Sequence, residues 1–132
     1  MRIKIITSER IKNKFAGEAI KEYTKRLTRY CKVKLSATNN IAKEIKGNTY
    51  LIKISSNGKM LTSEELAEKI SSLGVRGNSH ITFVYDNEHH IEDADFNLKI
   101  SDMDIASDLL LIILYEQIYR AYRIINNEPY HK

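Results

Sequence analysis

The sequence is poor in the features that mark secreted and membrane proteins. Its single cysteine, Cys31, rules out a disulfide framework, and a lone, partly buried thiol fits a reducing cytoplasm. The longest apolar run, Leu109 to Tyr115, is far shorter than the roughly 20 residues that cross a bilayer. The first apolar residues alternate with charged ones, unlike a signal-peptide core. We therefore expect a cytoplasmic protein with no membrane partner.

The sequence also lacks internal repeats and low-complexity linkers, so its 132 residues predict one domain, 1–132, with its own core. Alternating or continuous apolar segments predict strands at 2–7, 32–36, 49–54, 80–85 and 96–100. Apolar residues that recur every three or four positions predict helices at 8–30, 62–74 and 107–126. The polar segment 38–48 reads as a loop with one helical turn at most. Strands that alternate with helices predict an α/β fold, with a mainly parallel sheet flanked by helices.

Local signals suggest where these elements begin and end. Ser8 is a candidate N-cap for the first helix, and Thr62 has capping-box spacing to Glu65. Gly74 is the expected C-terminal glycine of the second helix. Asn57-Gly58 predicts a turn over 55–59 after the third strand.

Charge is unevenly spread along the chain, whose net charge is +4. Residues 1–34 hold most of the excess of lysine and arginine, and Lys25, Arg26 and Arg29 fall on or near one helix. Such a basic end suggests a polyanion such as RNA as a partner, although a solvated helix face accounts for the same charges. Residues 86–108 are strongly acidic, which favours a cationic ligand and opposes phosphate.

The last predicted helix is apolar on every side in its first turns, from Leu109 to Leu114. A helix with this pattern is expected to be buried all round. One chain of this size can hardly cover it, so a homodimer is the simplest solution.

Two segments near the C-terminus carry a family resemblance: Glu116-Gln-Ile-Tyr-Arg-Ala121 and Glu128-Pro-Tyr-His-Lys132. They resemble the C-terminus of the RlmH family, ribosomal RNA methyltransferases of the SPOUT (trefoil-knot) superfamily, and the order of elements agrees along the whole chain. The resemblance implies a knotted fold and a homodimer with the C-terminal helix at its interface. It also implies S-adenosylmethionine as cofactor and N3 of a pseudouridine in large-subunit ribosomal RNA, on the ribosome, as substrate. The tail is implied to reach the partner subunit's active site.

The resemblance places the cofactor in three loops. The first family loop, Leu-Asp-x-x-Gly-Lys, corresponds to Ile54–Lys59, which keeps Gly58. The second, Ile-Gly-Gly-x-x-Gly, corresponds to Tyr85–His90, which has no glycine. The third, Leu-Pro-His, corresponds to Ile105–Ser107. The implied cofactor-binding residues are Ile54, Ser55, Gly58, Asp86, Asn87, Ser101, Asp102, Met103, Asp104, Ile105 and Ala106.

Methyl transfer from a sulfonium requires alignment of the nucleophile and removal of the N3 proton. The candidate for proton handling is His131, because imidazole titrates near neutral pH. Tyr130 is suited to stacking on a flipped base, and Arg120, Arg123 and Lys132 are suited to phosphate or carbonyl groups. The alternatives are a frayed terminus for His131 and dimer packing for Arg120.

Two departures from the family pattern, in the second and third loops, motivate an alternative function. In that alternative the chain is a non-catalytic paralogue that binds RNA or the ribosome without cofactor. A weaker alternative is an unrelated α/β interaction domain. The segment Glu88–Asp93 matches no metal-ligand spacing, so no metal site is expected.

Overall fold

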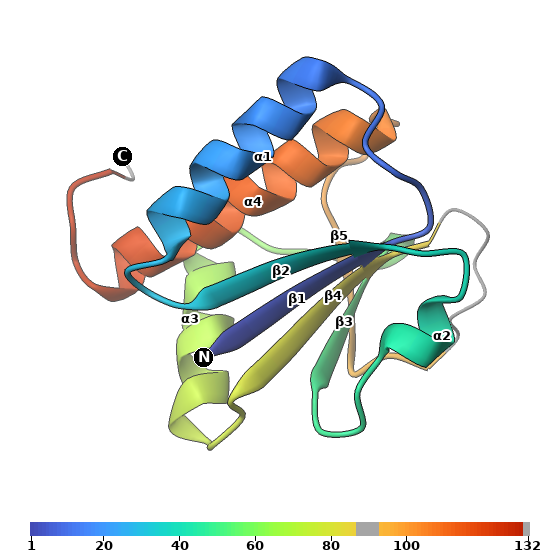
Figure 1. Cartoon of the computed structure of the whole chain (residues 1–132). Helices are drawn as coiled ribbons and strands as arrows, with labels where there is room; N and C mark the ends of the chain where they lie inside the picture. The colour runs from blue at the N-terminus through green and yellow to red at the C-terminus, as the bar shows by residue number, and fades with distance from the viewer. Residues whose placement is uncertain (87–92, 131–132) are drawn as a thin grey trace.

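The computed structural model describes residues 1–86 and 93–130, and Figure 1 traces its elements along the chain. In chain order these elements are β1 (Arg2–Thr7), α1 (Lys14–Leu27), β2 (Lys32–Ala37), α2 (Ile41–Glu44), β3 (Tyr50–Met60), α3 (Ser63–Val75), β4 (His80–Tyr85), β5 (Phe96–Lys99) and α4 (Ser107–Ile125). The predicted α/β fold is confirmed, and most predicted strands agree to within one or two residues.

The strands of the described residues form one five-stranded sheet in the order β2-β1-β4-β3-β5, and every pairing is parallel. Parallel sheets are usually covered on both faces, which suits the apolar sequences of β1 and β4 in the centre. Helices α1, α3 and α4 pack on one face, with α1 and α4 side by side (Figure 1). The short α2 covers part of the other face, over a small cluster of Ile6, Ile41, Leu51 and Val84. The predicted sheet is confirmed, and the knot stays a prediction.

Helix α4 is buried along most of its length, as its apolar sequence predicted. Leu111, Leu114 and Ile118 are at most 2% exposed, whereas Leu109 in the first turn is 56% exposed. Cys31 is buried beneath α4, and burial raises the pKa of its thiol to about 11. The thiol therefore stays protonated near neutral pH, as expected of a structural cysteine.

The predicted start of α1 is wrong, because Asn13 rather than Ser8 is its N-cap. The Oδ1 atom of Asn13 accepts hydrogen bonds from the backbone N–H groups of Phe15 (2.8 Å) and Ala16 (3.3 Å). The preceding segment is held in a non-helical course by α4. There Oδ2 of Asp108 accepts from the N–H groups of Lys12 (3.1 Å) and Asn13 (2.8 Å).

The predicted turn over 55–59 is a bulge inside a longer strand. Both Ile54 and Lys59 pair with Leu98 of β5, so residues 55–58 protrude from the ladder before the strand resumes at Lys59. A segment between the two pairings makes a loop without ending the strand.

The capping box that the spacing predicted at Thr62 is confirmed. The predicted end of α3 at Gly74 is wrong. The helix continues through Gly74 to Val75, and Gly77 takes the left-handed conformation with φ of 90°. The N–H of Asn78 donates to the carbonyl of Leu73 (2.9 Å), and the N–H of Gly77 donates to that of Gly74 (3.1 Å). This pair of bonds is a Schellman motif.

We expect Gly77→Ala to lower the free energy of unfolding by about 1–2 kcal/mol, because a Cβ is disfavoured at positive φ. Gly74→Ala is the matched control. Gly74 lies inside the helix with only the Cε of Met1 near, at 3.7 Å, so alanine there should stabilise the protein by up to about 1 kcal/mol. Urea unfolding of both variants measures the difference. Equal effects of the two substitutions would contradict the cap at Gly77.

Candidate functional site

A cleft of about 360 Å³ lies at the carboxyl edge of the sheet, beside β3, β4 and β5. Ligands of open parallel sheets bind outside the carboxyl ends of the strands. The lining residues come from the β3 bulge, the end of β4, the segment after β5 and the first turns of α4. They are Ile54, Ser55, Ser56, Tyr85, Asp86, Lys99, Ile100, Ser101, Met103, Asp104, Ile105 and Leu110.

Side-chain to backbone hydrogen bonds shape two walls of the cleft. The Oγ of Ser55 accepts from the N–H of Asn57 (3.2 Å), and the Oγ of Ser101 accepts from the N–H of Met103 (3.0 Å). Serine side chains that bond two residues ahead stabilise turns of this kind. Both turns are therefore fixed by their own sequence.

The charges that line the cleft are mixed, with carboxylates in excess. Asp86 is 2% exposed at the end of β4, and Asp104, in the segment after β5, also lines the cleft. The ammonium of Lys99 forms an ion pair with Asp102, which lies outside the lining. Apolar walls from Ile54, Ile105 and Leu110 complete the cleft. A cationic organic ligand fits this combination of apolar surface and carboxylates.

Gly58 lies where the β3 bulge meets the backbone of β5. A Cβ placed on Gly58 would lie 2.6 Å from the carbonyl oxygen of Asn97 and 2.8 Å from the carbonyl carbon of Leu98. Only glycine permits an approach this close between two backbone segments. The close approach brings together two of the segments that line the cleft, 54–56 and 99–105.

Most of the predicted cofactor residues are gathered at this cleft. Ile54, Ser55, Asp86, Ser101, Met103, Asp104 and Ile105 line it. Gly58 lies beside it, in the β3 bulge. Asp102 is not among the lining residues but pairs with Lys99, which is, and Ala106 lines a different cavity. Asn87 lies outside the described residues. Sequence reasoning missed Ser56, Tyr85, Lys99, Ile100 and Leu110, although the ends of parallel strands were a signal for Tyr85 and Lys99.

The C-terminal segment packs against α4 and α1. The ring of Tyr130 meets that of Tyr119 edge to face at 5.0 Å, and the guanidinium of Arg120 lies 4.9 Å from the Tyr130 centroid. Arg120 also donates from Nε to Oε1 of Glu116 (3.0 Å). Burial, a hydrogen bond with Tyr23 and the Glu116 carboxylate raise the pKa of Tyr130 to about 12, so its phenol is neutral near pH 7. His131 and Lys132 lie outside the described residues.

Glu128 fixes the direction in which this segment leaves α4. It accepts from the hydroxyl of Tyr30 (2.6 Å), and its other carboxylate oxygen accepts from Nη1 of Arg123 (2.9 Å). Arg29 approaches it at 3.6 Å. Asn127, with φ of 55°, forms the C-terminal turn of α4. The hydrogen bond from Tyr30 is the main cause that lowers the pKa of Glu128, so the carboxylate is charged near neutral pH.

This network gives Arg123, which was predicted to contact phosphate or carbonyl groups, a role in holding the C-terminal segment. Its side chain is 16% exposed and also donates to the carbonyl of Pro129 (3.1 Å), so it supports the tail rather than an open surface. Lys25, Arg26 and Arg29 are exposed, as a basic surface requires. Arg26 lies over the rings of Tyr23 and Tyr119, at 5.7 and 5.9 Å.

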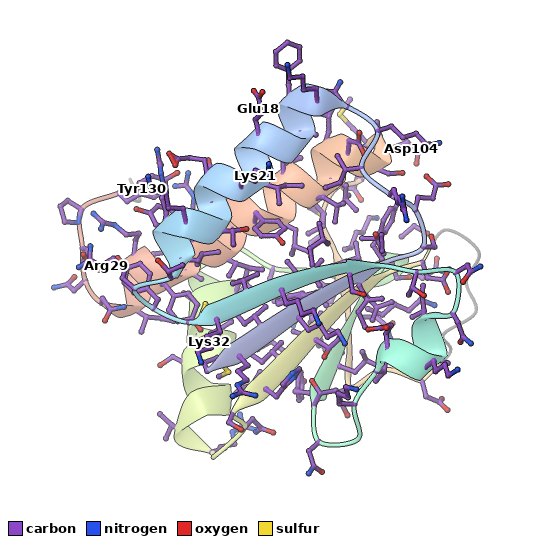
Figure 2. The ribbon with its side chains drawn as sticks, viewed as in Figure 1. Glu18, Lys21, Arg29, Lys32, Asp104 and Tyr130 are labelled. Atoms are coloured by element: carbon purple, nitrogen blue, oxygen red, sulfur yellow. The ribbon has the colours of Figure 1, made fainter. Side chains whose placement is uncertain are left out.

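Within one chain the cleft and the tail lie apart. The cleft contacts the first turns of α4, and the tail leaves its last turn, so the 19-residue helix separates them by about 28 Å. Figure 2 shows this separation, with Asp104 and Tyr130 at opposite ends of the pair α1 and α4. The predicted catalytic and cofactor-binding residues are therefore not brought together by a single subunit.

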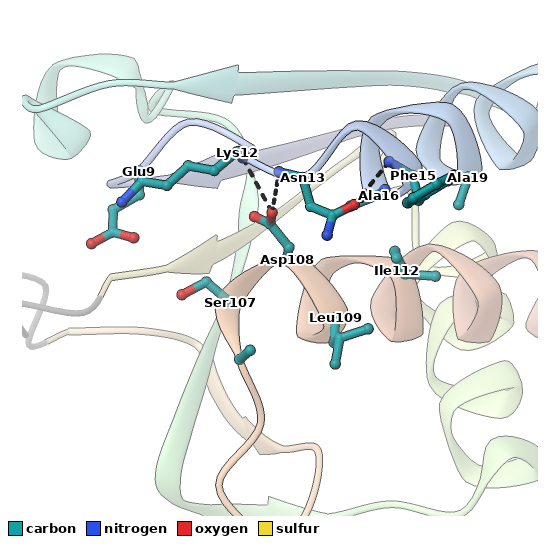
Figure 3. Close-up of a pocket in the computed structure, with 11 residues that line it drawn as sticks. Glu9, Lys12, Asn13, Phe15, Ala16, Ala19, Ser107, Asp108, Leu109 and Ile112 are labelled. Carbon is teal, nitrogen blue, oxygen red and sulfur yellow. Dashed lines mark hydrogen bonds between the residues drawn. The ribbon is translucent and has the colours of Figure 1, made fainter.

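A second, more apolar cavity of about 680 Å³ lies between the starts of α1 and α4. Figure 3 shows Phe15 and Leu109 at this cavity, beside the hydrogen bonds from Lys12 and Asn13 to Asp108. Phe15 is 77% exposed and Leu109 56% exposed. Large exposed apolar side chains grouped in this way are typical of a protein interface.

A family model described as Predicted SPOUT methyltransferase matches residues 1–131. The chain is 38% identical to Ribosomal RNA large subunit methyltransferase H of Acetivibrio thermocellus. It is 41% identical to the protein of the same name from Alkaliphilus oremlandii, and both alignments cover all of each chain. The chain belongs to the SPOUT methyltransferase family. The resemblance that the C-terminal motifs indicated is thereby confirmed.

The fold resembles that of a solved structure. A probable methylase family protein from Haemophilus influenzae superposes with a TM-score of 0.57 at 16% identity, over 96% of the SPOUT chain and 66% of that chain. In the described part of the SPOUT chain, no helix is long and apolar enough to cross a membrane. Residues 1–86 and 93–130 contain no group of three or more His, Cys, Asp or Glu that could hold a metal ion.

Proposed function

We propose that the chain transfers the methyl group of S-adenosylmethionine to N3 of a pseudouridine in large-subunit ribosomal RNA, as a cytoplasmic homodimer. The observation that carries the proposal is the cleft at the carboxyl edge of the sheet. Seven of the eleven residues expected to bind the cofactor line it. Its volume falls in the range of small-molecule sites, and its buried Asp86 suits a ligand that carries a positive sulfonium.

Each group of residues has a defined task in this proposal. When bound, S-adenosylmethionine supplies an activated methyl group. Ile54, Ile105 and Leu110 hold its apolar parts and keep water out, while Asp86 and Asp104 provide a negative field for its cationic part. His131 takes the N3 proton of the base. Tyr130 stacks on the base as a neutral phenol, and Arg120, 4.9 Å from the ring centroid, helps to hold the Tyr130 ring in place.

The separation of cleft and tail along α4 supports the proposed homodimer. A second copy that covers Phe15 and Leu109 would remove these apolar side chains from water, at about 25 cal/mol for each Å² buried. The same copy would bring its own tail towards this end of α4. We infer that one site combines the cleft of one subunit with Tyr130, His131 and Lys132 of the other, the C-terminal helices lying at the interface.

Calorimetric titration of the purified protein with S-adenosylmethionine tests the first step. We expect saturable heat, and Asp104→Lys should weaken binding about tenfold, on the order of 1.4 kcal/mol, because it reverses a charge that lines the cleft. Asp93→Lys is the matched control, since Asp93 is exposed and outside the cleft.

No heat from the parent protein at millimolar ligand would end the methyltransferase proposal. It would favour the alternative of a non-catalytic RNA-binding or ribosome-binding paralogue. If the cofactor binds, methylation of ribosomes that lack the modification identifies the substrate. Absence of the methylated product when the ribosomes also lack pseudouridine identifies the base.

A further inference from the structure

A basic groove of about 240 Å³ lies between the amino ends of three neighbouring strands, far from the cofactor cleft. Its charged and titratable lining residues are Arg2, Lys4, Lys32, Lys34 and His80. Alternate residues of a strand point to the same face of a sheet, and these five come from alternate positions of β1, β2 and β4. They occupy the face opposite α1, α3 and α4, and Figure 2 shows Lys32 at the amino end of β2.

The groove carries more positive charge than its neighbours neutralise. Lys4 pairs with Glu44 at 2.9 Å, and Glu44 also accepts from the hydroxyl of Ser36. Arg2, Lys32 and Lys34 form no ion pair with any residue in 1–86 or 93–130, and all three are exposed. Partial burial, then the charges of Lys4 and Arg2, lower the pKa of His80. A positive potential therefore extends over the groove.

Pairing of like charges across strands makes the groove unusual for a surface that only needs to be soluble. Arg2 stands directly opposite Lys32, and Lys4 stands directly opposite Lys34. Like charges in such pairs are destabilising. Lysine on an edge strand protects it from pairing with other sheets, which accounts for Lys32 and Lys34 on β2. It does not account for Arg2, because β1 is paired on both sides and Arg2, unlike Lys4, has no ion pair with the described residues.

We propose that this basic groove binds the phosphate backbone of the substrate RNA, at a surface separate from the methyl-transfer site. The choice of RNA as the polyanion rests on the proposed function. The neighbouring strands β1 and β2 place their cations side by side, at about 4.8 Å between the strands. Contacts with phosphate position an RNA without reading its sequence. The groove lies at the amino edge of the sheet and the cleft at the carboxyl edge, so the groove orients the RNA from a distance.

Binding of a labelled RNA stem–loop to the full-length protein at several salt concentrations tests the groove. Arg2→Gln and the double variant Lys32→Gln/Lys34→Gln should each bind less tightly. The slope of log affinity against log salt should fall by about 0.7 to 0.9 for every phosphate contact removed. Arg76→Gln is the matched control for Arg2→Gln, because Arg76 is an exposed arginine at the C-cap of α3, the helix that packs on the other face. Its slope should equal that of the parent.

Three results would overturn the groove proposal. The first is that the groove variants match Arg76→Gln in affinity and slope. The second is that they aggregate while the remaining soluble protein keeps the parent slope, which would assign Lys32 and Lys34 to edge protection alone. The third is equal affinity of the parent for polyglutamate and RNA, which would indicate an acidic protein partner.

Titration of the same variants with S-adenosylmethionine separates the groove proposal from the methyltransferase proposal, because the groove lies outside the cleft. If the parent binds no cofactor but the salt slopes of the groove variants fall as expected, the methyltransferase proposal fails and the proposal of RNA binding at the groove is supported.

Discussion

A chain that ends at Pro129 should fold, dimerise and bind S-adenosylmethionine, yet transfer no methyl group to ribosomal RNA. The truncation removes the ring of Tyr130, whose packing on Tyr119 is worth about 0.5–1.5 kcal/mol, so the loss of stability should be small. It leaves Glu128, Arg123 and Tyr30 in place to end α4 correctly. Methylation of unmodified ribosomes measures activity, while calorimetry and light scattering measure cofactor binding and dimerisation.

Single substitutions divide the effect of the truncation between its residues. His131→Ala should lower kcat by on the order of 10² to 10⁴-fold, the usual contribution of an acid or base in the right position. Tyr130→Phe keeps the ring and removes only the hydroxyl that donates to Glu116 (3.3 Å), so its effect should be small. Methylation by the truncated protein at the rate of the full chain would refute a catalytic tail.

Mixed dimers test whether the tail acts on the partner subunit. One chain lacks residues 130–132, and the other keeps them but carries Ser101→Trp, which fills the cleft with an indole. Each homodimer should be inactive. A heterodimer should hold one complete site, so an equal mixture should regain about a quarter of the sites of the parent, as random pairing of identical interfaces requires. No recovery on mixing would show that tail and cleft must belong to one chain.

Periodicity alone was enough to predict most of the sheet and helices, because the apolar positions of β1, β4 and α4 are set by which face is buried. The start of α1 was not predictable in this way. Ser8 is a good N-cap by residue type, but Asp108, a hundred residues later, holds the N–H groups of Lys12 and Asn13 outside the helix. A contact between segments so distant in sequence leaves no local signal.

The roles of individual glycines were also not predictable from local sequence alone. Gly74 and Gly77 are both reasonable ends for α3, and the bonds from Gly77 and Asn78 back to the last turn decide between them. Asn57-Gly58 predicted a turn because this pair favours positive φ. The structure instead uses Gly58 for its missing Cβ, against the backbone of β5. The cofactor loops were placed through the family resemblance, while the separation of cleft and tail depends on the length of α4.

Gly58→Ala should impair both the fold and cofactor binding. The new Cβ would lie 2.6 Å from the oxygen and 2.7 Å from the carbon of the Asn97 carbonyl, and 2.8 Å from the carbonyl carbon of Leu98. These are backbone atoms of a paired strand, so β3 and β5 must move apart instead of a side chain rotating away. We expect a loss of about 1–3 kcal/mol in the free energy of unfolding, the range for overpacked sites.

The same displacement should reach the cleft, because Ile54 and Ser55 line it before the bulge and Lys99 to Ser101 line it after β5. Affinity for S-adenosylmethionine should therefore fall more than stability alone explains, in protein that calorimetry shows to be fully folded at the assay temperature. Gly47→Ala is the control, since a Cβ there meets nothing within 4 Å and the backbone has no positive φ. If the two variants are equally stable and bind cofactor equally well, the close approach of Gly58 to β5 is not what shapes the site. If only stability falls, the bulge supports the fold and the cofactor is held by the other two loops.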